Sequence, residues 1–69
     1  MTKEEAAVFL QHVKAAQKAL EQAANYLLEL EPTTAHQALR RQAAEIIALT
    51  ITDLELPIIN RYAELNPYK

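Results

Sequence analysis

Residues 6–30, AAVFLQHVKAAQKALEQAANYLLEL, decide the fold of this chain. Apolar side chains recur in this stretch at alternating spacings of three and four residues, the pattern of a helix packed lengthwise against another helix. The members of the repeat are Ala6, Phe9, Val13, Ala16, Leu20, Ala23, Leu27 and Leu30. The repeat predicts a long amphipathic helix and, with it, an all-α fold.

Signals on either side of the repeat set the ends of this helix. Thr2 and Glu5 match the T-x-x-E capping box, which predicts that the helix begins at Lys3. The next proline is Pro32, and the residue before a proline disfavours the helical conformation. We therefore expect the first helix to cover residues 3–31.

A second helix follows after a very short connection, Pro32-Thr33-Thr34. Thr34 with Gln37 reads as a second capping box, and Thr33 is the alternative cap. We expect the second helix over residues 35–65. Because a short connection makes consecutive helices antiparallel neighbours, residues 1–69 form a single helical hairpin.

The second helix carries its own apolar face at helical spacing. Its members are Ala43, Ile47, Thr50, Ile51, Leu54, Ile58, Tyr62 and Leu65. With the tip at residues 32–34, Val13 lies opposite Leu54, and Ala16 opposite Thr50 marks the closest approach of the two backbones. The Thr50 hydroxyl is expected to bond back to the Ile46 carbonyl.

Pro57 interrupts this second segment, because proline removes a backbone hydrogen bond and crowds the carbonyl four residues before it. A capping box at Thr52 and Glu55 favours a break of the helix, whereas the continuous apolar spacing favours a kink. We expect the kink. Asn66-Pro67 should then end the helix and leave Tyr68-Lys69 as a tail.

Apolar residues outside the two facing stripes predict self-association. Leu49, Leu56 and Ala63 repeat at heptad spacing with Ile59 beside them, on a ridge that the hairpin partner does not cover. A chain of 69 residues without cysteine is marginally stable alone. These features predict a homodimer in which two hairpins form a four-helix bundle.

Composition argues against several classes of function. The chain has no glycine for phosphate-binding loops, a formal charge of −2, and no basic cluster larger than Arg40-Arg41. No apolar run approaches the ~18 residues of a membrane span, and the opening Thr-Lys-Glu-Glu is unlike a signal peptide. We expect a cytoplasmic protein that binds neither membrane nor nucleic acid.

The titratable residues form no reactive set. The register puts His12 near Asp53, whereas His36 lies at the hairpin tip, so the two histidines cannot share a metal ion. Neither histidine has the neighbouring ligands that a metal site requires, and no nucleophile stands beside a base. We expect no enzyme activity, no metal and no cofactor.

Tyrosine and arginine at the edges of the apolar faces favour protein binding, because these residues are enriched at binding hot spots. The residues expected to contact a partner are Arg61, Tyr62, Tyr26, Leu49, Leu56 and Ile59. In the alternative interpretation the tyrosines only cover the ends of the bundle, and Arg61 makes an exposed ion pair with Glu5.

The opening Met-Thr-Lys-Glu-Glu and the hairpin plan resemble the plasmid copy-number regulators, which bind paired RNA loops as dimeric four-helix bundles. The chain departs from that family because acidic Glu21 and Glu29 alternate with Lys14 and Lys18 on the outer face of the first helix, and because it has no cysteine. An RNA-binding regulator is therefore an alternative function, and a purely structural subunit is another.

The hairpin over residues 2–65, its Pro32-Thr33-Thr34 tip and the tail Asn66-Pro67-Tyr68-Lys69 resemble the small anti-activators of quorum sensing encoded by Pseudomonas phages. The resemblance spans the whole chain without a diagnostic motif. It implies a dimeric helical inhibitor whose partners are a LuxR-type transcription activator and the type IV pilus assembly ATPase. Our leading expectation is accordingly a dimeric inhibitor that binds and blocks a host bacterial protein.

Overall fold

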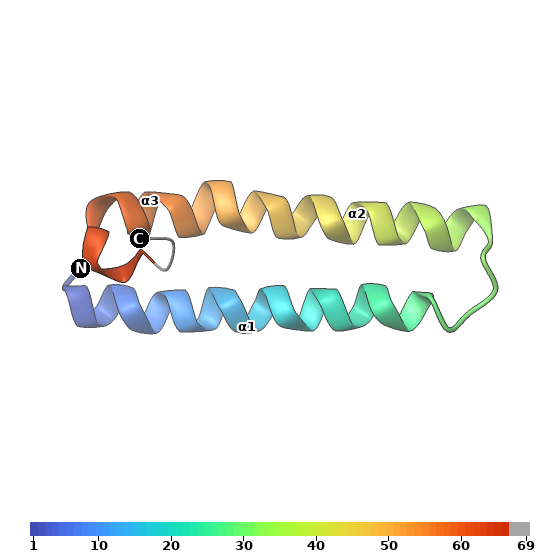
Figure 1. Ribbon diagram of the computed structural model, residues 1–69, viewed down its shortest axis with the longest axis horizontal. Coiled ribbons are helices and arrows are strands. Elements are labelled where there is room, and N and C mark those ends of the chain that lie inside the picture. Colours follow the sequence, from blue (N-terminus) through green and yellow to red (C-terminus); the bar gives the residue numbers. More distant parts are fainter. Residues whose placement is uncertain (67–69) are drawn as a thin grey trace.

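The computed structural model describes residues 1–66, which form a helical hairpin. Helix α1 (Lys3–Leu27) and helix α2 (Thr34–Thr50) run antiparallel, and a π-helical turn η1 (Ile51–Glu55) joins α2 to helix α3 (Leu56–Arg61). A 3-10 turn η2 (Ala63–Leu65) closes the described chain. Figure 1 shows two long helices side by side, with the first described residues and the turn η2 at the end opposite the tip. The predicted all-α hairpin is confirmed.

The start of α1 follows the predicted capping box. Thr2 Oγ1 accepts a hydrogen bond from the Glu5 N–H at 3.1 Å, and the Thr2 N–H donates to Glu5 Oε1 at 2.7 Å. Two backbone donors that have no partner inside the helix are thereby satisfied.

The end of α1 comes at Leu27, earlier than the predicted residue 31. The chain tightens there into a turn in which Leu28 N–H donates to Asn25 O at 3.0 Å and Leu30 N–H donates to Leu27 O at 3.3 Å. A chain without glycine cannot readily use a left-handed cap, and no residue in 1–66 has a positive φ. The tightened turn and Pro32 end the helix instead.

The alternative cap, Thr33, starts the second helix. Thr33 Oγ1 accepts from the His36 N–H at 3.1 Å, so the capping box predicted at Thr34 and Gln37 is wrong. The His36 ring nitrogen Nδ1 lies 2.6 Å from the Glu31 carbonyl oxygen and ties the helix to the loop. His36 therefore has a structural role at the tip.

The second helical segment passes Pro57 without a break, which confirms the predicted kink. Because Pro57 has no N–H, the backbone ladder changes before it: the Leu56 N–H donates to Ile51 O, five residues back. The capping box at Thr52 and Glu55 does not form, since Thr52 Oγ1 lies 3.3 Å from Ala48 O within the helix. The π turn is thus the structural response to proline.

The last helix ends at Arg61 rather than at the predicted residue 65. Tyr62 leaves the helical region with φ −123° and ψ 74°, and its hydroxyl donates to the Met1 carbonyl. Lys3 and Glu64 form an ion pair at the same end. These contacts fold the chain back over the start of α1. The predicted roles of Pro67, Tyr68 and Lys69 lie outside the described residues.

The packed seam on α1 differs from the predicted stripe by one position at three places. Its buried or half-buried members are Ala6, Leu10, Val13, Gln17, Leu20, Ala24 and Leu27. Gln17 and Ala24 thus replace the predicted Ala16 and Ala23, whereas the predicted Phe9 is half-buried beside the buried Leu10. The antiparallel register agrees to within one residue, because Gln17 contacts Thr50 where Ala16 was expected.

The packed seam on the second segment changes at the π turn. A π turn holds about one residue more than an α turn, so later residues are rotated by about 100°. Glu55 and Ile59 are buried at 1% and 4% exposure, whereas the predicted Leu54 is exposed and the predicted Ile58 is only half-buried. The expectation that Ile59 lies on an exposed ridge is therefore wrong.

Candidate functional site: a protein-binding surface

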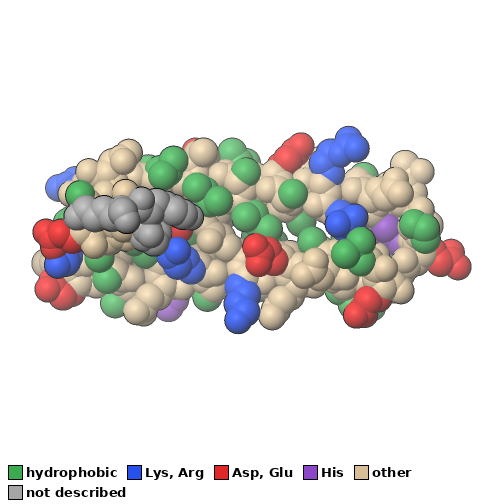
Figure 2. All heavy atoms as spheres, viewed as in Figure 1, with side chains coloured by type: hydrophobic (Ala, Val, Ile, Leu, Met, Phe, Trp, Pro, Cys, Tyr) green, Lys and Arg blue, Asp and Glu red, His purple; other side chains and the backbone are tan. Residues whose placement is uncertain are grey.

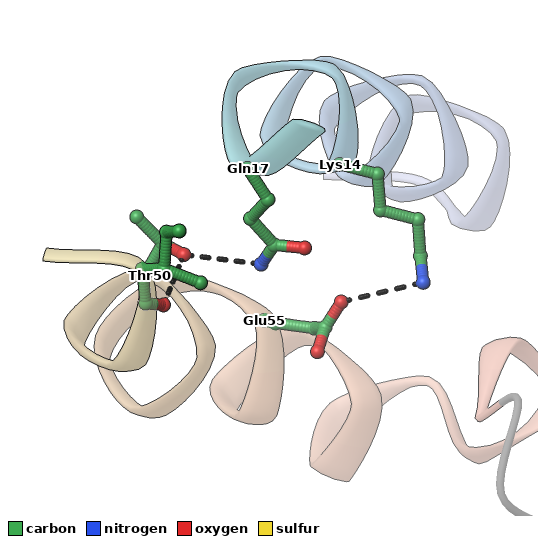
Figure 3. A network of polar contacts seen from close by, with 5 residues as sticks. Lys14, Gln17, Thr50 and Glu55 are labelled. Carbon is green, nitrogen blue, oxygen red and sulfur yellow. Dashed lines mark hydrogen bonds and ion pairs between the residues drawn. The ribbon is translucent and has the colours of Figure 1, made fainter. Parts of the chain in front are cut away.

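One hydrogen bond between side chains, from Gln17 to Thr50, crosses the seam near the middle of the hairpin (Figure 3). Gln17 Nε2 donates to Thr50 Oγ1 at 3.0 Å, and the Thr50 hydroxyl donates to the Ile47 carbonyl at 2.6 Å, rather than to the predicted Ile46. Buried polar groups need such partners. The need to satisfy Thr50 is a physical reason why Gln17, rather than Ala16, faces the second helix.

Glu55 is the one buried charged side chain among the described residues. Its Oε1 lies 3.5 Å from Lys14 Nζ and has no hydrogen-bond donor, and half of the Lys14 side chain is exposed (Figure 3). Removing a carboxylate from water costs several kcal/mol, which a single half-exposed lysine only partly offsets. The pair therefore adds little stability.

The positions just before the seam residues form one side of the hairpin. In an antiparallel pair of right-handed helices, these positions project to the same side on both helices, about 100° from the seam. The apolar members, called the apolar face below, are Phe9, Ala16, Ala19, Ala23, Tyr26, Leu39, Ile46, Leu49 and Leu54. Leu39, Ile46 and Leu54 are 55%, 46% and 42% exposed.

The positions just after the seam residues form the opposite side, which is polar. They include Lys14, Lys18, Glu21, Asn25 and Arg41. On the side shown in Figure 2, side chains of both charge signs flank hydrophobic ones that follow the line between the helices. The mixed charges offer no basic surface of the kind that binds a nucleic acid backbone.

Shallow hollows lie on both sides of the hairpin and open to solvent. On the polar side Ala24 and Ala44 leave a groove of about 300 Å³ that Glu21, Asn25, Arg40 and Ile47 also line. On the apolar side a hollow of about 280 Å³ is lined by Ile46, Leu49, Thr50, Asp53 and Leu54. Open hollows of this shape suit side chains of a protein partner better than a small ligand.

The predicted contact residues are divided between two regions. Tyr26 and Leu49 are 58% and 56% exposed, on α1 and α2 respectively. Arg61 and Tyr62 lie together at the end with the chain termini, where the Arg61 guanidinium carbon is 5.9 Å from the Tyr62 ring centroid. The described residues hold no Arg61–Glu5 ion pair, because the Glu5 carboxylate caps α1.

The π turn splits the predicted ridge of the second helix. Leu49 and Leu56 are both exposed, but the extra residue between them places Leu56 on the polar side, immediately after Glu55. Leu56 is therefore separated from Leu49, and Arg61, five residues along α3 and about 140° further around its axis, points to another side of the helix. Nothing but Pro57 marked this division in the sequence.

The residues considered for chemistry stay apart. No hydrogen bond or ion pair joins His12 to Asp53 in residues 1–66, where the Asp53 carboxylate lies 3.3 Å from the Thr52 hydroxyl. Across the same residues, no group of three or more His, Asp or Glu side chains is placed to hold a metal ion. None of the described helices is long and apolar enough to cross a membrane.

The fold and its surfaces define a class, the antiparallel helical hairpin with one uncovered apolar side. Comparisons of the chain with protein-family models, curated proteins and solved structures found no match. The resemblance to phage anti-activators remains a prediction from the sequence.

Proposed function

We propose that this chain is an inhibitor that acts by binding a bacterial protein, and that it works as a homodimeric four-helix bundle. The observation that carries the proposal is the amount of apolar side chain left on its surface. The exposed large apolar residues are Met1, Val8, Tyr26, Leu28, Leu30, Leu39, Ile46, Leu49, Leu54 and Leu56. Contiguous apolar patches of more than a few hundred Å² on a soluble domain mark protein interaction sites.

The end of the hairpin opposite the tip supplies residues for contact with the inhibited protein. Leu56 is exposed on one side of α3, and on another side the Arg61 guanidinium carbon lies 5.9 Å from the Tyr62 ring centroid. Arginine and tyrosine side chains placed together match the composition of binding hot spots. Tyr26 and Leu49 are also exposed, but they stand just before the seam residues Leu27 and Thr50, on the same side of the hairpin as the apolar face.

The resemblance makes a LuxR-type activator and the type IV pilus assembly ATPase the first partners to test. We expect the purified chain to bind one of them with a dissociation constant in the micromolar range or below, measured by calorimetry. Arg61→Ala should weaken binding at least tenfold, because the arginine that stands over the Tyr62 ring is lost. Arg41→Ala is the matched control on α2 and should leave affinity unchanged.

Two results would contradict this proposal. One is the absence of binding to either partner at concentrations where the chain is fully helical by circular dichroism. The other is tight binding to structured RNA whose affinity falls steeply with salt, which is the signature of a copy-number-type regulator.

A further inference from the structure

We propose that the apolar face of one hairpin is covered by the apolar face of a second copy, with each α1 packed on the partner copy's α2. The inference rests on the proposed dimer and adds the surface and orientation that form it. The face runs along the hairpin, from Phe9 and Leu54 toward Ala23 and Leu39 near the tip.

The chain exposes more surface than a compact chain of its mass does, and the excess is close to the area that one partner buries in a standard interface. The described hairpin belongs to a chain of 7.8 kDa with 5229 Å² of accessible surface. A compact folded chain of that mass exposes roughly 4,400 Å². The excess is roughly 800 Å², about the area that each partner buries in a stable protein–protein interface.

The shape of the chain supports the same occupant. Its radius of gyration is 14.7 Å and its extents are 45 × 20 × 16 Å. A compact domain of this length has a radius of gyration of about 11 Å, and one of twice the length about 14 Å. The radius of gyration of a single hairpin therefore already matches that of a compact assembly of two copies. A second hairpin layered on the first would make the assembly thicker without making it longer.

The composition of the face makes it complementary to itself. Along the middle of the face the α1 half presents the small exposed side chains of Ala16, Ala19 and Ala23, with the large Phe9 and Tyr26 only at its ends, whereas the α2 half presents the large side chains of Ile46, Leu49 and Leu54. When the two-fold axis runs along the hairpin, the small half of each copy meets the large half of the other. Alternation of large and small residues is what close helix packing needs.

The reversed orientation, with the tip of one copy over the termini of the other, packs less evenly. It would place the leucine and isoleucine side chains of α2 against those of the other α2. The alanines would face each other across the paired α1 helices. The two helix pairs would then need different separations, so we assign the orientation in which both tips lie at the same end.

Two neighbouring alanines give a matched test of the face. Ala15 and Ala16 are both exposed on the same turn of α1, but Ala15 points away from the seam and Ala16 belongs to the apolar face. We expect the wild-type chain and Ala15→Glu to sediment as dimers at micromolar concentration. Ala16→Glu should raise the dimer dissociation constant at least a hundredfold, because a carboxylate would be buried against apolar side chains.

Orientation and folding need their own measurements. In a cysteine-free chain, Thr34→Cys places one spin label at each tip. The inferred dimer gives an inter-label distance on the order of 20 Å, set by neighbouring helices, whereas the reversed dimer gives one near the 45 Å length of the molecule. If Ala16→Glu fails to fold, a wild-type melting temperature that rises with protein concentration supports the dimer.

The inference is overturned if the wild-type chain is still a monomer at a concentration 100-fold above that of the calorimetric measurement of partner binding. It is also overturned if Ala16→Glu forms dimers as readily as Ala15→Glu. A long inter-label distance overturns the orientation. These results are distinct from failure of the proposed function, in which the dimer forms normally but binds neither candidate partner. If the wild-type chain is a monomer and Ala16→Glu no longer binds the inhibited protein, the apolar face contacts that protein instead of a second copy.

Discussion

The two ends of the hairpin are built from the same pair of helices, yet they differ in how much they bury. All of the buried residues that the structure describes lie in the half with the chain termini: Ala6, Leu10, Val13, Glu55 and Ile59. In the tip half, seam residues such as Leu20, Ala24 and Ile47 are only half-buried. A long helical pair can therefore form along its whole length while packing a core in only half of it.

The difference arises because a third segment, the turn η2 that follows α3, packs on the two helices at the end opposite the tip. There the residues after Arg61 leave the helix and fold back over the start of α1, where Tyr62 bonds to Met1. At the tip, alanines occupy the seam and leave open grooves between the helices. The terminal half stabilises itself, whereas the tip half gains most from a partner that covers it.

The largest effect should come from shortening a leucine in the packed half. Leu10→Ala should lower the free energy of unfolding by about 2–5 kcal/mol, because the residue is buried and its loss leaves a cavity. Leu20→Ala, ten residues along the same helix, should cost only about 1–2 kcal/mol, since its side chain is half-buried. Urea denaturation at one fixed protein concentration measures both, and equal losses would break the comparison.

The buried ion pair should respond in opposite directions to two apolar substitutions. Glu55→Leu should raise the free energy of unfolding by about 1–3 kcal/mol, because it removes a buried carboxylate that has only one partner. Lys14→Met should lower it by about 1–2 kcal/mol, because the carboxylate would lose that partner. Chemical denaturation of both variants tests the pair, and a loss of stability in Glu55→Leu would show that Glu55 stabilises the fold.

The same two halves show what the sequence could and could not predict. The hairpin, its register and the Thr2 cap follow from local signals: heptad spacing, a T-x-x-E box and a short connection. The seam on α1 was misplaced because apolar or small residues stand at both members of the pairs Phe9/Leu10 and Ala23/Ala24. Periodicity alone cannot choose between two adjacent stripes that are both apolar.

The second misplacement has another cause. An extra residue in a π turn leaves no trace in the hydrophobic pattern, so the pattern put Leu54 on the packed face where the structure has Glu55. Pro57 was the only local signal, since its missing N–H requires the backbone ladder to adjust. The same shift explains why Ile59, which follows the turn, is buried although it was expected on an exposed ridge.

A smaller effect should separate two neighbouring threonines at the tip. Thr33→Ala should lower the free energy of unfolding by about 1 kcal/mol, because Thr33 Oγ1 caps α2 through the His36 N–H. Thr34→Ala is the matched control, and surface changes of this kind stay within about 0.5 kcal/mol. Thermal unfolding followed by circular dichroism checks both. An equal cost at the two positions would mean that the helix begins differently in solution.

The smallest effect should be the pH dependence of the ion pair between Lys3 and Glu64. The hydrogen bond from Lys3 to Glu64, together with the charge of that carboxylate, raises the pKa of Lys3 above its ordinary value of 10.5. A raised lysine pKa means that the folded chain holds the proton more tightly than the unfolded one. The contribution is therefore complete below the ordinary pKa and is lost as the pH rises through the raised one.

Comparison with Lys3→Gln isolates this contribution from the other groups that titrate in alkali. The wild-type chain should be slightly more stable than the variant at pH 7 and at pH 9, and the difference should disappear above the raised pKa of Lys3. Because both side chains are exposed, the difference should also shrink with added salt. If the difference in stability persists at high pH, Lys3 stabilises the terminal half through packing of its aliphatic chain on the folded-back segment. The stability of this half then comes from burial and not from the ion pair.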